Sequence, residues 1–308
     1  MDGDPEGPEG PEGPEGPTAV GQALAILGDR WVLLILHRAF VLRVRTYAGF
    51  RDALSISESV LAARLKELVR TGILTHVPVR DGRTRHEYRL TGSGLALWPL
   101  LVAIYTWEAR WSGRALPPLV HDVCGRPGLP YLSCGTCGRA VAARDTETLP
   151  AAAFAGAGPP RRHRRTVRAD AGADAFGYLP ASMEILGDRW STNVLAAAFL
   201  GTRRFVDFQT RLGVAPSVLA DRLRRFAEQD VFTAAGGDYR LTDKGLGFFP
   251  VFAFLVDWAR REIAAPPGSG PAIVHRPCGA ALVPVLSCPA CAGPLRRKEI
   301  HYGAGHPP

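Results

Sequence analysis

The chain has 308 residues, 46% of them hydrophobic, so it is long enough for two domains with their own apolar cores. It contains no run of 18 apolar residues and no basic start followed by an apolar stretch. We therefore expect neither a membrane span nor a signal peptide, and a cytoplasmic location. The net charge is +8, and the six acids of residues 1–17 leave 37 basic against 23 acidic residues in the remainder. A basic body favours a polyanionic partner.

Two segments lack the apolar residues that a core requires. Residues 1–17 repeat Gly, Pro and Glu, which predicts a disordered acidic tail. Residues 150–176 are rich in Ala, Gly and Pro, which predicts a disordered linker. The linker is basic because of the arginine run at 161–165, which suits either contact with a DNA backbone or an ordinary solvated linker.

The sequence repeats itself on either side of this linker. The motif Leu-Gly-Asp-Arg-Trp at 27–31 returns at 186–190, and Ser-Val-Leu-Ala-x-Arg-Leu at 59–65 returns at 217–223. Leu-Thr at 90–91 returns at 241–242, and the cysteine cluster returns as well. Repetition of several separate motifs in the same order predicts two tandem copies of one unit.

The first copy has the pattern of a winged helix-turn-helix, in which a DNA-reading helix is followed by a β-hairpin. Apolar spacing predicts helices over 20–27, 31–40, 47–54 and 59–71, and a closing helix over about 91–114. Strands are predicted over 73–79 and 85–90, on either side of an Asp-Gly turn at 81–82. The closing helix carries more apolar residues than one small core can bury, which indicates a dimer face.

The predicted fold class is mainly α with small β wings. Two winged helix-turn-helix domains are expected at 18–116 and 177–265, and a small zinc-binding knuckle is expected after each, at 117–149 and 266–300.

The helix over 59–71 is the predicted recognition helix, because Leu61, Leu65 and Leu68 share one buried face and leave small and basic residues opposite. Arg64 and Arg222 lie beside the leucine faces, so a phosphate contact and an ion pair within the module remain equally open for both. The candidate DNA-binding residues of the two copies are Ser59, Ala62, Ala63, Arg64, Lys66, Arg70, Arg80, Arg83, Arg85, Arg203, Arg204, Ser217, Arg222 and Arg224.

Together, these motifs and the Tyr-Arg-Leu-Thr strand end at 88–91 resemble the HxlR family of bacterial regulators. The resemblance covers about residues 20–111 and 178–261. It implies a winged helix-turn-helix fold and dimers joined through terminal helices. Several family members sense oxidants through a cysteine before the first helix. This chain has Thr18 and Gly177 at the matching places, so that chemistry does not carry over.

The two copies are predicted to be unequal in DNA binding. The second wing is shorter by seven residues and has lost the arginines of its tip. The second recognition helix presents Asp221 and Glu228 outward, and such acids repel phosphate. We expect the first copy to hold DNA more strongly, with the second reading a weaker half-site or serving mainly as an internal dimer partner.

All six cysteines fall into two sets that share one spacing, His-x2-Cys-x9-Cys-x2-Cys. Four such ligands suit tetrahedral zinc, and a structural disulfide is not expected in a cytosolic protein. We predict two structural zinc ions, one per knuckle; one ion supplied by both halves is an alternative. The predicted ligands are His121, Cys124, Cys134 and Cys137, then His275, Cys278, Cys288 and Cys291.

The sequence therefore predicts a sequence-specific transcription regulator that binds double-stranded DNA as a covalent pseudo-dimer, with recognition helices about 34 Å apart. A protein-interaction adaptor and a thiolate-zinc redox sensor are the alternatives. We expect no enzyme, because no phosphate loop and no nucleophile with its base is present. No motif identifies a small-molecule effector, and association of two chains is left open.

Overall fold

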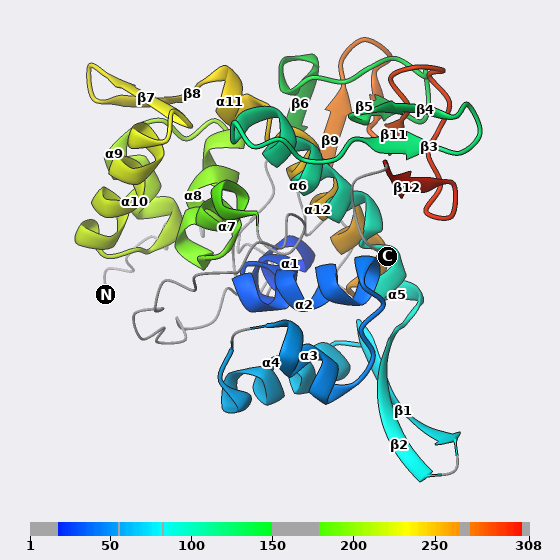
Figure 1. The fold of residues 1–308 in the computed structure, drawn as a ribbon. Coiled ribbons are helices and arrows are strands. Elements are labelled where there is room, and N and C mark those ends of the chain that lie inside the picture. Colours follow the sequence, from blue (N-terminus) through cyan, green and yellow to red (C-terminus); the bar gives the residue numbers. More distant parts are fainter. Residues whose placement is uncertain (1–17, 55, 82, 150–178, 265–271, 304–308) are drawn as a thin grey trace, which may run out of the picture.

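The computed structural model describes residues 18–54, 56–81, 83–149, 179–264 and 272–303 (Figure 1). The predicted tail at 1–17 and linker at 150–176 lie outside these residues. Within the described part of the chain, no single helix is long and apolar enough to cross a membrane. One pair of helices, bent by 80° between residues 27 and 30, reaches the length and apolar composition of a membrane span only when both helices are counted together.

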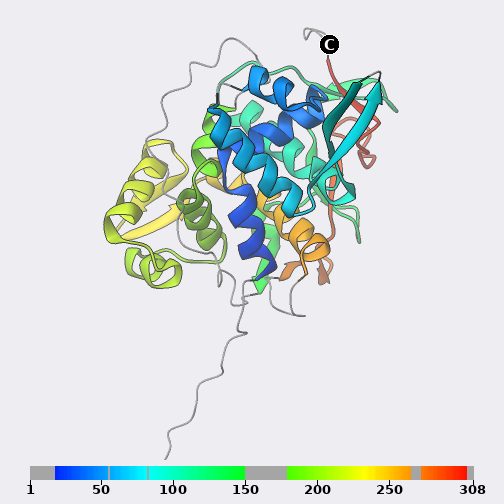
Figure 2. The same ribbon diagram turned by 90° about the horizontal axis from the view of Figure 1, so that it is seen from below.

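The duplication predicted from sequence is confirmed by two sets of elements in the same order. The first module contains α1 (Ala19–Leu27), α2 (Arg30–Val41), α3 (Tyr47–Ala53), α4 (Glu58–Arg70), β1 (Leu74–Asp81), β2 (Arg83–Leu90), α5 (Gly92–Leu95) and α6 (Trp98–Trp111). The second contains α7 (Pro180–Leu186), α8 (Arg189–Phe199), α9 (Phe205–Leu212), α10 (Pro216–Glu228), β7 (Phe232–Ala235), β8 (Asp238–Leu241), α11 (Asp243–Leu246) and α12 (Phe249–Glu262). In Figure 2 the yellow-green part of the second module, with α9, α10, β7 and β8, forms a lobe beside the first module, whereas α12 (orange) lies against the first module.

The closing helix predicted over 91–114 is wrong in one respect, because it is divided into α5 and α6. Pro99 stands in the first turn of α6. Proline has no N–H to donate to the carbonyl four residues earlier, and its ring clashes with that carbonyl. A proline is tolerated in the first turn of a new helix, however, so α6 begins one residue before it, at Trp98.

The repeated Leu-Gly-Asp-Arg-Trp motif ends one helix and starts the next. Asp29 Oδ1 accepts hydrogen bonds from the backbone N–H groups of Trp31 and Val32, at 2.9 and 3.3 Å, and so caps α2. The glycines of the two motifs face the other half of the chain. A Cβ added at Gly187 would lie 2.9 Å from the Cβ of Arg30, so a larger residue would push the halves apart.

The two modules meet through their closing helices, because α6 packs against α12. The indole N–H of Trp107 donates to the carbonyl of Lys244 at 3.0 Å, and that of Trp258 donates to the carbonyl of Ser93, also at 3.0 Å. Each tryptophan therefore reaches the short helix of the other module at the matching position. These reciprocal contacts relate the two modules by approximate two-fold symmetry.

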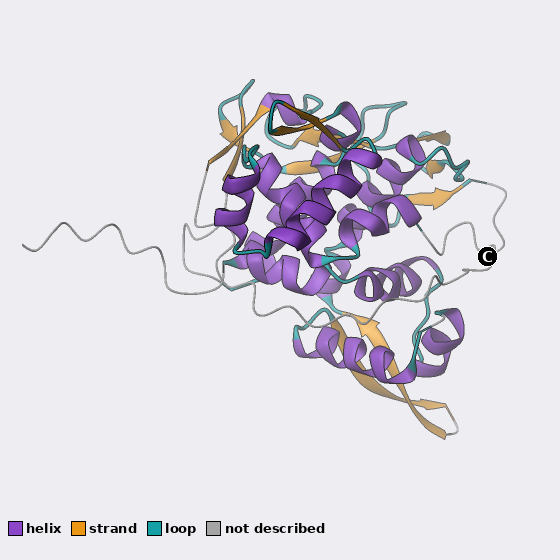
Figure 3. Cartoon of the chain, turned by 90° about the vertical axis from the view of Figure 1, so that its left-hand side faces the viewer, coloured by secondary structure: helices purple, strands orange, loops and turns teal. Residues whose placement is uncertain are grey.

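The wings differ in length, as the sequence predicted. The strands β1 and β2 have eight residues each, whereas β7 and β8 have four each. The long hairpin projects away from the helices (Figure 3).

The two predicted knuckle regions are interlocked. They contain β3 (Leu119–His121), β4 (Arg126–Gly128), β5 (Tyr131–Cys134), β6 (Thr146–Leu149), β9 (Ala272–His275), β10 (Ala280–Ala281), β11 (Pro284–Ser287) and β12 (Ile300–Tyr302). Each of their three sheets takes strands from both halves, through the pairs β12 with β3, β11 with β5 and β6 with β9. Each region therefore completes its sheets with strands of the other.

A buried carboxylate fastens the second module to the first. Glu108 on α6 is 0% exposed, and its oxygens accept hydrogen bonds from Ser182 N–H at 2.7 Å, Ser182 Oγ at 2.6 Å and Ala181 N–H at 3.3 Å. These backbone donors belong to the first turn of α7, which has no side-chain cap of its own. Since the N-terminus of a helix carries partial positive charge, the carboxylate is favoured there.

We predict that Glu108→Ala lowers the free energy of unfolding by about 2–3 kcal/mol, because it leaves the first turn of α7 without its charged acceptor. Urea denaturation followed by circular dichroism measures this difference. The control is Glu147→Ala, since Glu147 is exposed on β6. Equal stabilities of the two variants would contradict the capping role.

Candidate metal centres and nucleic-acid interface

The eight predicted metal ligands lie in two clusters, and each cluster draws on both halves of the chain. One cluster holds His121 and Cys124 together with Cys288 and Cys291, and the other consists of Cys134, Cys137, His275 and Cys278. Within each cluster all four ligand atoms lie within 4.8 Å of one another. The prediction that each half supplies a complete site is therefore wrong, although the eight residues are the predicted ones.

Strand pairing explains why the ligands are exchanged. Because β5 and β11 run antiparallel, Ser287 lies opposite Tyr131, and this brings Cys288 beside the β3–β4 hairpin of the other half. A Cβ added to Gly128 on β4 would lie 2.4 Å from Pro289. The two cysteines after β11 therefore meet the histidine and cysteine beside β3. Sequence spacing does not show which half completes a site.

Ligand distances are similar in the two clusters. In the first, Cys124 Sγ lies 3.7 Å from Cys288 Sγ, and His121 Nδ1 lies 3.4 Å from Cys291 Sγ. In the second, Cys134 Sγ lies 3.9 Å from Cys278 Sγ, and His275 Nδ1 lies 3.4 Å from Cys137 Sγ. Each cluster offers one imidazole nitrogen and three sulfurs around one centre.

The first cysteine of each Cys-x2-Cys turn has a lowered pKa. Burial by itself raises the pKa of the Cys134 thiol, but hydrogen bonds from the backbone of Cys137 and Thr136 outweigh it and bring the pKa to about 6. The same turn after β11 brings the pKa of Cys288 to about 7, against the same effect of burial. Since the thiolate is the form that binds a metal, these hydrogen bonds favour the ligand form of the first cysteine of each turn.

The predicted recognition helix is α4, and its exposed face is the one expected. Leu61, Leu65 and Leu68 are 0% exposed. The side chains on the opposite face are exposed, and they are Ser59, Ala62, Ala63, Lys66 and Arg70. Arg70 donates to both carboxylate oxygens of Glu67, at 2.9 and 2.7 Å.

Arg64 forms the ion pair that the sequence left as one of two alternatives. Its Nη2 lies 2.6 Å from Asp29 Oδ2, and both side chains are 11% exposed. Arg222 likewise binds Asp188 in the second module. Burial by itself raises the pKa of Asp188, but the hydrogen bond and charge of Arg222 hold that pKa below its usual range. In both copies this arginine ties the recognition helix to the aspartate that caps an earlier helix, α2 in the first module and α8 in the second.

The candidate residues at the tip of the first wing are Arg80, Arg83 and Arg85. They belong to β1 and β2, but their side chains lie outside the described part of the structure. At the base of the wing, Arg43, Arg45 and Arg89 form a cluster that we call the wing-base cluster. Burial, followed by the nearby charge of Arg89, lowers the pKa of Arg45, while Glu87, which pairs with Arg89 at 3.1 Å, acts in the opposite direction. Three arginines with one carboxylate leave net positive charge, which favours an anion such as phosphate.

Sequence reasoning missed Arg43 and Arg45. Tyr88 N–H on β2 donates to the carbonyl of Arg45 at 2.7 Å, and Tyr239 N–H makes the matching bond to Arg203 at 2.8 Å. Arg203 was a sequence candidate in the second copy, so comparison of the copies was the signal that could have identified Arg45.

The exposed face of α10 is largely neutralised by its own acids. Arg224 pairs with Asp221 at 2.8 Å and with Glu228 at 2.5 Å, and Arg225 pairs with Asp221 at 3.0 Å. Ser217 is exposed on the same helix, and Arg203 and Arg204 are exposed next to α9. Arg204 lies 3.9 Å from Asp238. The second copy therefore presents less uncompensated positive charge along its recognition helix.

We predict that Arg64→Ala lowers the free energy of unfolding by about 2–3 kcal/mol, because it leaves the carboxylate of Asp29 nearly buried without its partner. Chemical denaturation measures the change. Arg70→Ala is the matched control on the same helix, with an expected loss of about 0.5 kcal/mol or less, because that pair is exposed. Equal losses for the two variants would refute a structural role specific to Arg64.

Comparison with known protein families finds one family model that matches two separate regions of the chain. The family model for the HxlR-like helix-turn-helix matches residues 26–115 and 185–266, together more than half of the chain.

The individual relatives match part of the chain. Rv3095 of Mycobacterium tuberculosis, named an uncharacterized HTH-type transcriptional regulator, is 37% identical over 139 residues, which are 44% of this chain and 87% of that protein. YvaP of Bacillus subtilis, with the same description, is 36% identical over 91 residues, 29% of this chain and 83% of that protein. The crystal structure of PA1607 is 31% identical to this chain over the matched part, which is 44% of this chain and 97% of that chain, with a TM-score of 0.37.

Proposed function

The chain belongs to the family of HxlR-like helix-turn-helix proteins, and on that premise we propose that it is a DNA-binding transcriptional regulator whose two modules act as a covalent pseudo-dimer. The reciprocal tryptophan contacts between the modules carry this proposal, because they hold two copies of the DNA-binding unit in a two-fold arrangement. Such an arrangement suits a DNA site made of two half-sites. We infer that the protein acts in the cytoplasm, at the nucleoid.

The first module is the stronger DNA-binding half in this proposal. Lys66 stands on the exposed face of α4 among small residues, where it has no ion pair within the described residues. Small side chains let a helix approach base edges, and a lysine reaches phosphate or guanine. The wing-base cluster adds positive charge beside the hairpin. Arg70 on α4 has a carboxylate partner, as the arginines of α10 do, so Lys66 is the basic side chain that distinguishes α4 from α10.

We predict that Lys66→Ala weakens DNA binding and lowers the slope of log K against log salt concentration by about 1, because one phosphate contact is lost. Arg224→Ala is the matched variant in α10 and should change the slope much less. Fluorescence anisotropy with genomic fragments selected by the wild-type protein measures both variants. Equal effects of the two variants would show that both modules contribute equally to DNA binding. Absence of DNA binding by the wild-type protein near physiological salt would refute the proposal that it is a DNA-binding regulator.

We further propose that each four-ligand cluster holds one structural zinc ion. With Zn–S about 2.3 Å and Zn–N about 2.0–2.1 Å, a tetrahedral ion separates its ligand atoms by roughly 3.5–3.8 Å. The sulfur–sulfur separations of 3.7 and 3.9 Å agree with that geometry. Each cluster has four protein ligands, as structural zinc sites do. When bound, zinc would join the two halves, because no half has a complete set of ligands in one cluster.

Paired cysteine substitutions test the exchange of ligands directly. Wild type should contain two zinc ions per chain by elemental analysis. The double variant Cys134→Ser with Cys278→Ser changes two ligands of the same cluster, so one ion should remain. The double variant Cys124→Ser with Cys134→Ser changes one ligand in each cluster, so both ions should be lost or weakly held.

Sites confined to each half would give the reverse result, since Cys124 and Cys134 would then share a site. Circular dichroism of both double variants serves as the control for folding of the winged modules. No zinc in the wild-type protein would refute the metal centres altogether, and this result would leave the DNA-binding proposal standing.

A further inference from the structure

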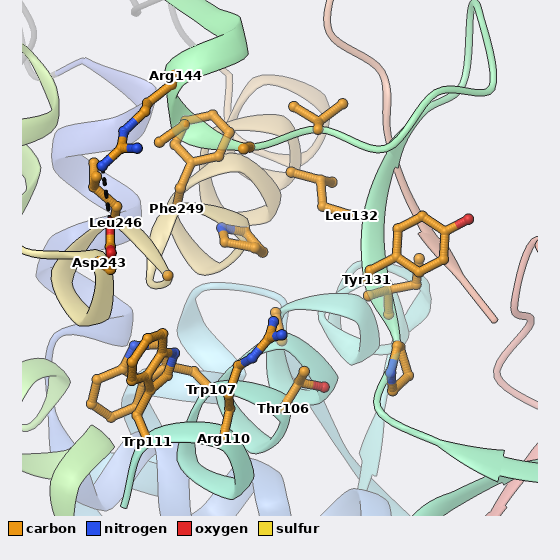
Figure 4. A pocket seen from close by; sticks show the side chains of 18 residues that line it. Thr106, Trp107, Arg110, Trp111, Tyr131, Leu132, Arg144, Asp243, Leu246 and Phe249 are labelled. Atoms are coloured by element: carbon orange, nitrogen blue, oxygen red, sulfur yellow. Dashed lines mark hydrogen bonds and ion pairs between the residues drawn. The ribbon is translucent and has the colours of Figure 1, made fainter. Parts of the chain in front are cut away.

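A cavity of about 330 Å³ lies between the two modules and the interlocked strands (Figure 4). Its walls come from α6 of the first module, from α11 and α12 of the second, and from β5 and β11. None of the metal ligands and none of the recognition-helix residues lines it. The volume lies at the lower end of the range for small-molecule sites and suits a molecule of one or two rings.

The walls are mainly aromatic and aliphatic. Trp107 and Trp111 line one side from α6, Phe249 faces them from α12, and Tyr131 and Leu132 contribute from β5 (Figure 4). Flat aromatic side chains favour a flat ring in contact with them, through stacked or edge-to-face packing. The shape and chemistry of these walls therefore suit an aromatic ligand.

The charged residues of the cavity leave one positive charge uncompensated. Arg144 is at the rim, where it pairs with Asp243 at 2.9 Å. Arg110 extends from α6 toward the cavity, and among the described residues it makes no hydrogen bond or ion pair. A guanidinium beside apolar walls is suited to a carboxylate, which it can bind through two parallel hydrogen bonds.

The second module shows which kind of residue pairs with this arginine when a partner is present. Arg261 on α12 holds the position that matches Arg110, and its Nε and Nη2 donate to Asp257 Oδ2 at 3.0 and 2.6 Å. The residue that matches Asp257 in the first module is Thr106. The same arginine is therefore neutralised from within its helix in one module and left without a carboxylate in the module where it lines the cavity.

We propose that this cavity binds a small aromatic carboxylate. The ring lies among Trp107, Trp111 and Phe249, and the carboxylate pairs with Arg110 in the place that Asp257 fills for Arg261. The site does not depend on the proposed DNA-binding function, because binding to it is measured on the protein alone.

The probe is 1-naphthoate, titrated into the full-length, metal-loaded chain by calorimetry and by quenching of tryptophan fluorescence. We expect saturable binding with one ligand per chain, and at least tenfold weaker binding of the neutral 1-naphthamide. Absence of binding at millimolar concentration, or equal binding of the amide, would overturn the proposal.

Two variants test the role of Arg110. Arg110→Gln removes the charge, and Thr106→Asp introduces the carboxylate that the second module carries at the matching position. Each should weaken 1-naphthoate binding at least tenfold, while the matched control Arg261→Gln should leave it unchanged. Unchanged affinity of Arg110→Gln would refute the site even if Thr106→Asp were to fold poorly, and circular dichroism and metal content check the fold of each variant.

Discussion

The exchange of strands between the two halves is the constraint on which the rest of the structure depends. Each of the three small sheets outside the wings contains strands of both halves, and each metal cluster contains ligands of both halves. Segments this short cannot bury enough apolar surface to fold alone, so they need a partner or a metal. Here the short segments of the two halves pair with each other, and the packing of α6 against α12 holds the two halves together.

Joining two copies in one chain also allows the copies to differ. An ordinary homodimer must carry the same residues on both sides of its two-fold axis. This chain keeps the shared contacts, such as the two tryptophan bonds, and changes others. Glu108 caps a helix of the other module, while Ala259 is buried at the matching position. The long wing, the neutralised α10 and the different pairing of Arg110 and Arg261 are further differences that a symmetric dimer could not have.

Sequence comparison within the chain predicted the duplication, the order of helices and strands, the buried leucines of α4 and all eight clustered ligands. These features are local, because helix periodicity, turn residues and Cys-x2-Cys spacing act over a few neighbouring residues. The role of Arg64 was open between two alternatives, because an arginine at the edge of a buried face can point either way. Only its contact with Asp29, 35 residues earlier, decided the matter.

The sequence by itself therefore determined which residues can bind metal and which helix face is exposed. Tertiary structure alone decided which half completes each metal cluster and which helix Glu108 caps. The physical reason is that these contacts join residues more than 70 positions apart, for which local spacing carries no information. Pairing of β5 with β11 brings the metal ligands of the two halves together, and that pairing becomes visible only when both halves are folded together.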